Sequence, residues 1–124
     1  MVYSEVDQNP ACFSPYWLKD ILREELKFNG CVFSDDLSME GAKSMGDVTS
    51  RSKQALSAGC DMLLCCNDRE SVIEIIDNLP QKKNALSQAR IHNMLGKKLT
   101  TNFDELRSTS TWFDARQMLD SLNK

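Results

Sequence analysis

The chain lacks the long apolar run that a membrane span requires. No apolar stretch approaches the ~20 residues that cross a bilayer, and the first ten residues, MVYSEVDQNP, hold neither the basic region nor the apolar core of a secretion signal. A strong charge excess is also missing, since 15 basic and 18 acidic residues give a net charge of -3. The sequence therefore gives no electrostatic reason to expect a nucleic-acid or membrane-surface partner. With 124 residues, 41% of them apolar, it predicts one globular unit.

The sequence also lacks a C-x-x-C motif and an even number of cysteines, which argues against a disulfide framework or a common zinc site. The five cysteines are Cys12, Cys31, Cys60, Cys65 and Cys66. Free thiols in a reducing, cytoplasmic setting are the simplest interpretation. A metal site built from Cys60, Cys65, Cys66 and the one histidine, His92, would match no common zinc spacing. We therefore predict no bound metal and no cofactor.

Two short apolar runs, each followed by polar and acidic residues, predict buried parallel strands. Residues 31–33 end at Ser34-Asp35-Asp36, and residues 62–66 end at Asn67-Asp68. Gly30 and Gly59 precede these runs and lie 29 positions apart (59 − 30). That spacing fits the roughly 31-residue unit of a (β/α)8 barrel of ~250 residues. It fits other α/β folds equally well.

Helical patterns surround the predicted strands. Ser14-Pro15 is typical of a helix start, and Asn29-Gly30 is typical of its end. Between them, one apolar stripe is formed by Leu18, Ile21, Leu22 and Leu26. The other predicted elements are a strand remnant over 1–6, a loop over 7–13, and helices over 38–58 (interrupted at Gly46-Asp47 and stopped by Gly59), 72–79, 86–95 and 112–122.

Two or three strands cannot close a barrel, because the outer strands would keep unpaired edges. We therefore expect an α/β fold that is a partial (β/α)8 TIM barrel, its last two to three βα units, followed by C-terminal helices. Residues 1–124 form one part of such a domain, with βα units over 1–80 and a helical tail over 81–124 packed outside the sheet. Such a chain needs an upstream barrel segment or self-association.

The acidic pair after the first strand is the main candidate for chemistry. Active sites of parallel α/β barrels lie at the carboxyl ends of the strands, where Asp35 and Asp36 are expected. A carboxylate there can act as a nucleophile, a base or a metal ligand. An Asp after a strand also often caps the following helix. Local pattern alone leaves these roles open for both residues.

The run FNGCVFSDDLSMEGA over residues 28–42 resembles the nucleophile segment of family 3 glycoside hydrolases. Within that family it is similar to the bacterial cytosolic β-N-acetylglucosaminidases of peptidoglycan recycling. Residues 2–7 and 14–18 look like the segment after barrel strand six, and residues 58–64 look like strand eight. The similarity covers residues 1–80 well and the helical tail loosely.

This resemblance implies a retaining β-N-acetylglucosaminidase that removes terminal N-acetylglucosamine from peptidoglycan-derived muropeptides. The family motif places the nucleophile directly after the Ser, which is Asp35 here. Asp36 is then expected to be a structural hydrogen-bonding residue or a helix cap. Met39 is expected in the core, with the lining of a sugar pocket as the alternative.

The family's general acid/base is a His on a loop upstream of the nucleophile segment, and this sequence has no such loop. We expect His92 to lie at the surface or to pack a helix, and Lys43, Arg51 and Lys53 to be solvated. Without leaving-group protonation, worth about 10²–10⁴-fold, the chain alone is expected to be inactive. The alternatives are a non-catalytic half-barrel that works with a partner chain, and an α/β enzyme in which Asp35 and Asp36 bind a metal.

Overall fold

The computed structural model describes residues 2–80, 84–96 and 102–122. Two strands, β1 (Phe33–Asp36) and β2 (Met62–Leu64), form a parallel sheet. The helices are η1 (Ala11–Phe13), η2 (Tyr16–Glu25), η3 (Glu40–Met45), α1 (Val48–Ala58), α2 (Arg69–Asn78), α3 (Ala85–His92), α4 (Phe103–Arg107) and α5 (Ser110–Leu122). The order of strands and helices through α2 is that of an α/β fold with parallel βα units, as predicted.

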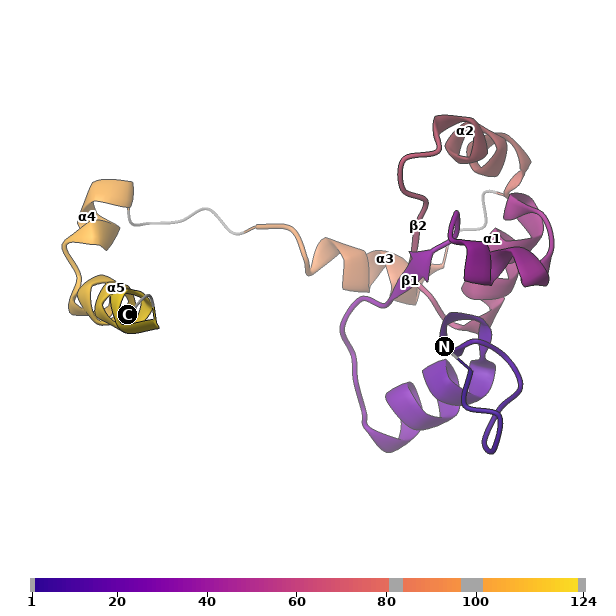
Figure 1. Cartoon of the computed structure of the whole chain (residues 1–124), viewed down its shortest axis with the longest axis horizontal. Coiled ribbons are helices and arrows are strands. Elements are labelled where there is room, and N and C mark those ends of the chain that lie inside the picture. The colour runs from indigo at the N-terminus through magenta and orange to yellow at the C-terminus, as the bar shows by residue number, and fades with distance from the viewer. Residues whose placement is uncertain (1, 81–83, 97–101, 123–124) are drawn as a thin grey trace.

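Helix α1 is the centre of the packing. It contacts β2, α2 and the three η helices, and Figure 1 shows α1 and α2 on the same side of the strands. The core that they enclose is small. Its buried members are Phe13, Val32, Leu37, Ala42, Val48, Ala55, Cys60 and Ile75. Leu37 and Ala55 are fully buried, so the turn after β1 is anchored directly in this core.

The ends of α1 and α2 follow local sequence signals. Asp47 accepts a hydrogen bond from Ser50 N at 2.7 Å at the start of α1, and Asp68 does the same with Ser71 N at 3.0 Å at the start of α2. Gly59 ends α1 with a φ of 130°, a conformation that L side chains rarely adopt. The predicted interruption at Gly46-Asp47 and the predicted stop at Gly59 are confirmed.

Helix η2 departs from the predicted pattern at its end. Ser14 starts it as expected, because its Oγ accepts from Trp17 N at 3.2 Å. The helix is of the π type, and Leu26 N donates to Ile21 O, five residues back. This wider turn takes Leu26 off the apolar stripe and leaves it exposed. The prediction was also wrong about Gly30, because the helix ends at Glu25 and the chain turns at Lys27, whose φ is 53°.

The predicted strand remnant over 1–6 is wrong for the described residues 2–6, and Met1 lies outside the described residues. The chain turns back on itself there, with Val6 N and Asp7 N both donating to Tyr3 O. Tyr3 and Asp7 form one isolated bridge. The predicted loop over 7–13 contains the short helix η1.

Strand β1 begins and ends later than the apolar pattern predicts. The predicted strand was 31–33, whereas pairing with β2 runs from Phe33 to Asp36. The polar residues stay in the sheet because side chains of Ser34 and Asp36 accept hydrogen bonds from the backbone of the neighbouring segment. Asp36 is thus the last residue of the strand, rather than a residue beyond it.

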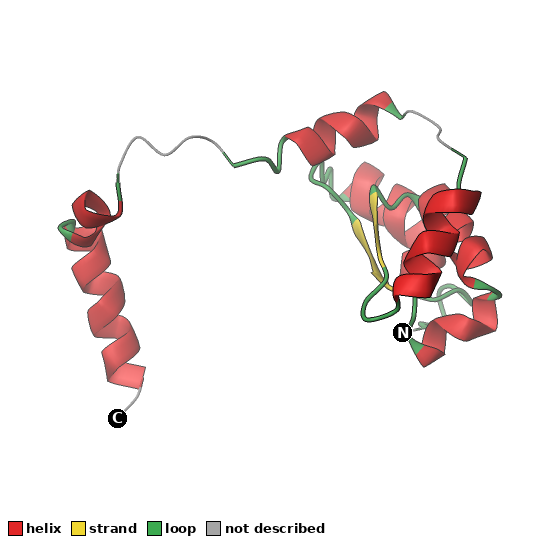
Figure 2. Cartoon of the chain, turned by 90° about the horizontal axis from the view of Figure 1, so that it is seen from above, coloured by secondary structure: helices red, strands yellow, loops and turns green. Residues whose placement is uncertain are grey.

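The C-terminal helices are partly as expected. Helices α3 and α5 begin one and two residues before the predicted segments 86–95 and 112–122, and α3 ends early, at His92. Helix α2 likewise begins before the predicted 72–79, at Arg69. Helix α4 was not predicted, and it packs on α5 through Phe103 and Trp112, whose ring centroids lie 5.7 Å apart. Figures 1 and 2 show α4 and α5 apart from the strands, so the expected packing of this part of the tail on the sheet was wrong. Across the described ranges, no helix has the length and apolar character needed to cross a membrane.

Candidate active site

Asp35 lies in β1 with its side chain exposed at the carboxyl end of the parallel sheet. Its Oδ1 accepts a hydrogen bond from the backbone N–H of Asp36 at 2.8 Å. Within residues 2–80, 84–96 and 102–122, no Lys or Arg side chain forms an ion pair with it. The carboxylate is therefore open to solvent, at the end of the sheet where parallel α/β folds carry their chemistry.

A cleft of about 540 Å³ lies beside Asp35. Part of its lining comes from β1 and the following turn, including Asp35, Asp36 and Met39, and part comes from the N-terminal segments, including Cys12 and Leu18. Most of the lining residues are apolar, and Asp35 and Asp36 supply the carboxylates. Such a cleft can hold the apolar face of a small ring while a carboxylate meets a reactive carbon.

Cys12 lines the same cleft as Asp35. Burial raises the pKa of Cys12, a backbone hydrogen bond with Asp35 lowers it, and the charge of Asp35 raises it again. The net result is a raised pKa, so the thiol is mostly protonated near neutral pH. Cys12 therefore contributes a neutral surface to the cleft.

Asp36 is half-buried, and one of its carboxylate oxygens accepts several hydrogen bonds in the turn after β1. Its Oδ1 accepts from Ser38 N at 2.9 Å, from Ser38 Oγ at 2.7 Å and from Cys66 N at 3.0 Å. The bonds from Cys66 and Ser38 lower the pKa of Asp36 and keep it ionised. The prediction that Asp36 is a structural hydrogen-bonding residue is confirmed, although it caps the turn at Ser38 rather than a helix.

Two other predictions about side chains were wrong. Met39 is 49% exposed and lines the cleft, so it is not a core residue. Arg51 is only 7% exposed, and its Nη1 donates to Leu37 O behind the acidic pair. The spacing of Arg51 from Val48 and Ala55, three and four positions, could have placed it on the buried face of α1. His92, Lys43 and Lys53 are exposed, as expected.

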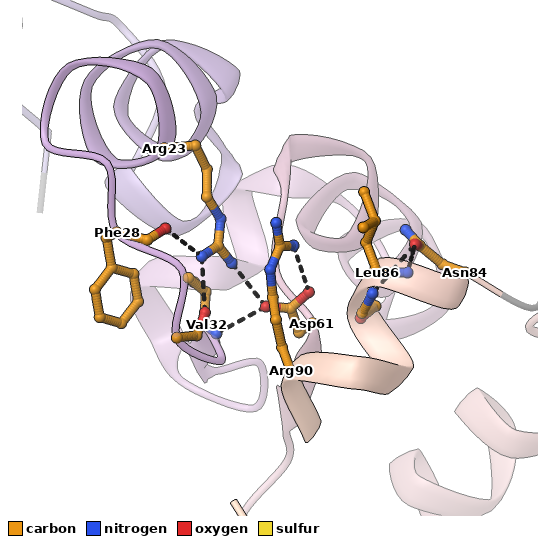
Figure 3. A network of polar contacts seen from close by, with 9 residues as sticks. Arg23, Phe28, Val32, Asp61, Asn84, Leu86 and Arg90 are labelled. Atoms are coloured by element: carbon orange, nitrogen blue, oxygen red, sulfur yellow. Dashed lines mark hydrogen bonds and ion pairs between the residues drawn. The ribbon is translucent and has the colours of Figure 1, made fainter. Parts of the chain in front are cut away.

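The opposite end of β2 carries a polar network that the sequence did not indicate. Figure 3 shows Asp61 between two arginines, with Arg23 Nη2 at 2.8 Å and Arg90 Nη1 at 3.2 Å from its oxygens. Val32 N also donates to Asp61 at 2.9 Å. Burial raises the pKa of Asp61, but the hydrogen bonds from Val32, Ser87 and Arg90 outweigh it and leave the pKa below 3.8. The network joins η2, β2 and α3.

A second hollow of about 630 Å³ lies beside Asp61 and includes Cys60 and Ser87. Because it opens at the amino end of β2, it lies away from the Asp35 cleft. Conserved chemistry in parallel α/β barrels is found at the carboxyl ends of strands, whereas the amino ends serve stability. The candidate site is therefore the Asp35 cleft.

All five cysteines are free thiols, as expected. Among the residues that the structure describes, no three His, Cys, Asp or Glu side chains are grouped closely enough to hold a metal ion. His92 lies in the last turn of α3, does not line the Asp35 cleft and is exposed. The described part of the chain thus brings two carboxylates to the cleft, Asp35 and Asp36, without a histidine beside them. Asp36 is held by Ser38 and Cys66, whereas the Asp35 carboxylate accepts, among the described residues, only from the N–H of Asp36.

Comparison with known proteins identifies relatives along the whole chain. A β-hexosaminidase of Pasteurella multocida is 45% identical over 128 residues, which cover 100% of this chain and 36% of that protein. A β-hexosaminidase of Haemophilus influenzae is 48% identical over 116 residues, covering 90% and 33%. The chain thus spans about a third of the length of these relatives.

Solved structures give the same relationship. The crystal structure of NagZ from Neisseria gonorrhoeae in complex with N-trifluoroacetyl-D-glucosamine superposes with a TM-score of 0.79 at 31% identity, covering 99% of this chain and 34% of that one. The family model for the glycosyl hydrolase family 3 N terminal domain matches residues 1–100. This family implies an α/β fold of the TIM-barrel type. The chain belongs to glycosyl hydrolase family 3, as part of its N-terminal domain.

Proposed function

We propose that this chain is the nucleophile-bearing part of a retaining β-N-acetylglucosaminidase, with Asp35 as the nucleophile. The observation that carries the proposal is the exposed carboxylate of Asp35 on the wall of a cleft, at the carboxyl end of a parallel strand. The names of the relatives support a hexosaminidase activity. The glucosamine derivative bound by the gonococcal protein supports an N-acetylglucosamine substrate.

In the proposed reaction, an Asp35 oxygen attacks the anomeric carbon and forms a glycosyl ester while the glycosidic C–O bond breaks. The leaving oxygen takes a proton from a general acid, and water then hydrolyses the ester with that acid acting as base. Asp36 is a poor candidate for the acid, because Cys66 and Ser38 hold it ionised. We assign the acid/base to a residue outside the 124 positions, since His92 does not line the cleft.

This assignment makes the chain incomplete on its own. Residues 1–80 would be the last βα units of a (β/α)8 barrel, and residues 81–124 its helical tail. The exposed side chains of Phe33 and Leu64, in β1 and β2, fit a sheet whose face a further segment covers. Terminal N-acetylglucosamine of peptidoglycan-derived muropeptides is the proposed substrate, and a cytoplasmic setting stays a prediction.

A second function is a non-catalytic half-barrel that acts by joining a partner chain. It is favoured by the apolar side chains that the small core leaves exposed, such as Ile76 at 63% and Leu119 at 62%. Both functions need a further segment or a partner, but only the first needs Asp35 to react.

The test compares the chain alone with the chain joined to the upstream residues of the Pasteurella relative. We expect no hydrolysis of 4-nitrophenyl N-acetyl-β-D-glucosaminide by the isolated chain. We expect turnover by the joined protein, and a loss of about 10³-fold or more for Asp35→Asn, as for removal of a nucleophile. Asp47→Asn is the matched control, because Asn also caps a helix well. Turnover by the joined protein that Asp35→Asn leaves intact would contradict the proposal.

A further inference from the structure

The strand that carries Asp35 contains one extra residue relative to its partner. Phe33 pairs with Met62 and Asp36 pairs with Leu64, so three steps along β1 correspond to two steps along β2. Ser34 and Asp35 are together opposite a single residue. A β-bulge of this kind bends the strand and changes the direction of a side chain, and bulges are frequent beside active sites.

The side chain of Ser34 fills the gap at this bulge. It is 3% exposed, and its Oγ accepts from Leu64 N at 2.9 Å and donates to the backbone carbonyl of Asp35 at 2.7 Å. Leu64 O in turn accepts from Leu37 N at 2.8 Å. The residue before Asp35 thus holds the backbone carbonyl of Asp35 and connects it to β2.

Asp36, the residue after Asp35, also restrains this part of β1. Its carboxylate accepts from Cys66 N at 3.0 Å, which joins the end of β1 to the segment after β2. The backbone N–H of Asp36 donates to Asp35 Oδ1 at 2.8 Å, which restrains rotation of the Asp35 carboxylate. Two neighbours of Asp35 therefore each use a side-chain oxygen to hold a backbone N–H of the facing segment.

We propose that Ser34 and Asp36 are positioning residues that aim the Asp35 carboxylate into the cleft through this bulge. The inference rests on the proposed role of Asp35 as nucleophile and extends it. Without the Ser34 hydroxyl, the N–H of Leu64 and the carbonyl of Asp35 lose these partners, and the bulge can relax toward a regular pairing. A shift of about 1 Å at a reacting group can reduce the rate about 10²-fold.

The test uses the whole chain joined to the upstream residues of the Pasteurella relative. Ser34→Ala and Asp36→Ala are each expected to lower kcat about 10²-fold, with KM changed by no more than about threefold, because orientation of the attacking group acts on the chemical step. Asp36→Asn keeps an oxygen acceptor for Cys66 N and is expected to recover kcat to within about tenfold of the parent. This rescue separates hydrogen bonding from charge.

Ser52→Ala is the matched control for Ser34→Ala. Ser52 is a fully buried serine whose Oγ donates to Val48 O within α1. Its removal costs a comparable buried hydrogen bond, so a kcat near that of the parent is expected. A similar loss of kcat in Ser52→Ala would attribute the effect of Ser34→Ala to general instability and overturn the assignment.

A second readout needs no activity. In the 124-residue chain, hydrogen exchange at Leu64 N is expected to accelerate at least tenfold in Ser34→Ala, and that at Cys66 N in Asp36→Ala, while the amides of α1 keep their rates. Should Ser34→Ala fail to fold, the pair Asp36→Ala and Asp36→Asn decides the matter. Ser34 and Asp36 variants with parental kcat, beside an inactive Asp35→Asn, would overturn the positioning role and leave the nucleophile in place. An active Asp35→Asn would instead remove the proposed function.

Discussion

The carboxylate of Asp36 accepts a hydrogen bond from the backbone N–H of Cys66 at 3.0 Å, across 30 positions of sequence. This bond joins the carboxyl ends of the two parallel chain segments beside the cleft. It also separates the two neighbouring acids chemically, because both line the cleft but Asp36 is held by hydrogen bonds from Cys66 and Ser38, while Asp35 is exposed. The difference between them has consequences for stability as well as for catalysis.

Acidification should weaken this end of the sheet. The pKa of Asp36 is lower in the folded chain than its ordinary 3.8, so its contribution to stability is fully present above that value and is lost as the pH falls through the lower folded value. We expect Asp36→Asn to unfold with a smaller pH dependence than the parent below pH 4. Urea unfolding followed by circular dichroism from pH 2.5 to 6 measures it. Equal pH dependence in both proteins would contradict this role.

The ion pairs of Asp61 should contribute more to stability than the hydrogen bonds of Asp36. Removing one partner of a buried ion pair leaves the other charges unpaired and typically costs about 3–5 kcal/mol, and Asp61→Ala would leave both Arg23 and Arg90 without it. We expect a loss near the lower end of that range, because the Arg90 side chain is 22% exposed. Chemical denaturation measures this loss in the free energy of unfolding. Asp77→Ala, at an exposed position of α2, is the control. A loss no larger than that of the control would show that the network is dispensable.

A side chain at Gly59 should destabilise the folded chain. Its φ of 130° disfavours L residues, and a Cβ there would lie 3.3 Å from Leu18 Cβ of η2. Backbone strain of this type costs about 1–3 kcal/mol, so Gly59→Ala is expected to lower the free energy of unfolding by that amount. Gly96→Ala is the control, because a Cβ at Gly96 meets nothing within 4 Å. Equal unfolding free energies for the two variants would contradict the account.

The cysteines should differ sharply in reactivity. Burial raises the pKa of Cys60 to about 12, whereas Cys66 is exposed. At pH 8 a thiol with that pKa is ionised in only about one molecule in ten thousand, and the thiolate is the reactive form. We expect iodoacetamide to label Cys66 first and Cys60 only after unfolding. Mass spectrometry of peptides after timed labelling checks the order, and early labelling of Cys60 in the folded chain would contradict the packing around β2.

The sequence predicted the parts of the structure that follow local rules. Asp47 and Gly59 act within a few residues of themselves, so the helix break and the helix stop at these positions were predicted. Asp68 acts by the same local rule, although the predicted helix began only at residue 72. The acidic pair could be placed at the end of a strand for the same reason. The resemblance of residues 28–42 to a family motif, rather than the local pattern, distinguished the two acids.

What could not be predicted depends on contacts between distant segments. Ser34 and Leu64 lie 30 positions apart, and no local pattern shows that a serine hydroxyl will enter the sheet and lengthen β1. The partners of Asp61 lie 38 and 29 positions away, which is equally invisible in a local pattern. Arg51 was misplaced because its charge was given more weight than its position on the buried face of α1.

The most direct test of the account is to trap the glycosyl-enzyme. The chain joined to the upstream residues of the Pasteurella relative is treated with a fluoroglycoside of N-acetylglucosamine whose ester is slow to hydrolyse, and is then digested with trypsin. The peptide over 28–43 contains both acids, and fragmentation distinguishes them. The account predicts one sugar adduct on Asp35 that is absent from Asp35→Asn. An adduct on Asp36, or on a residue outside this peptide, would contradict it.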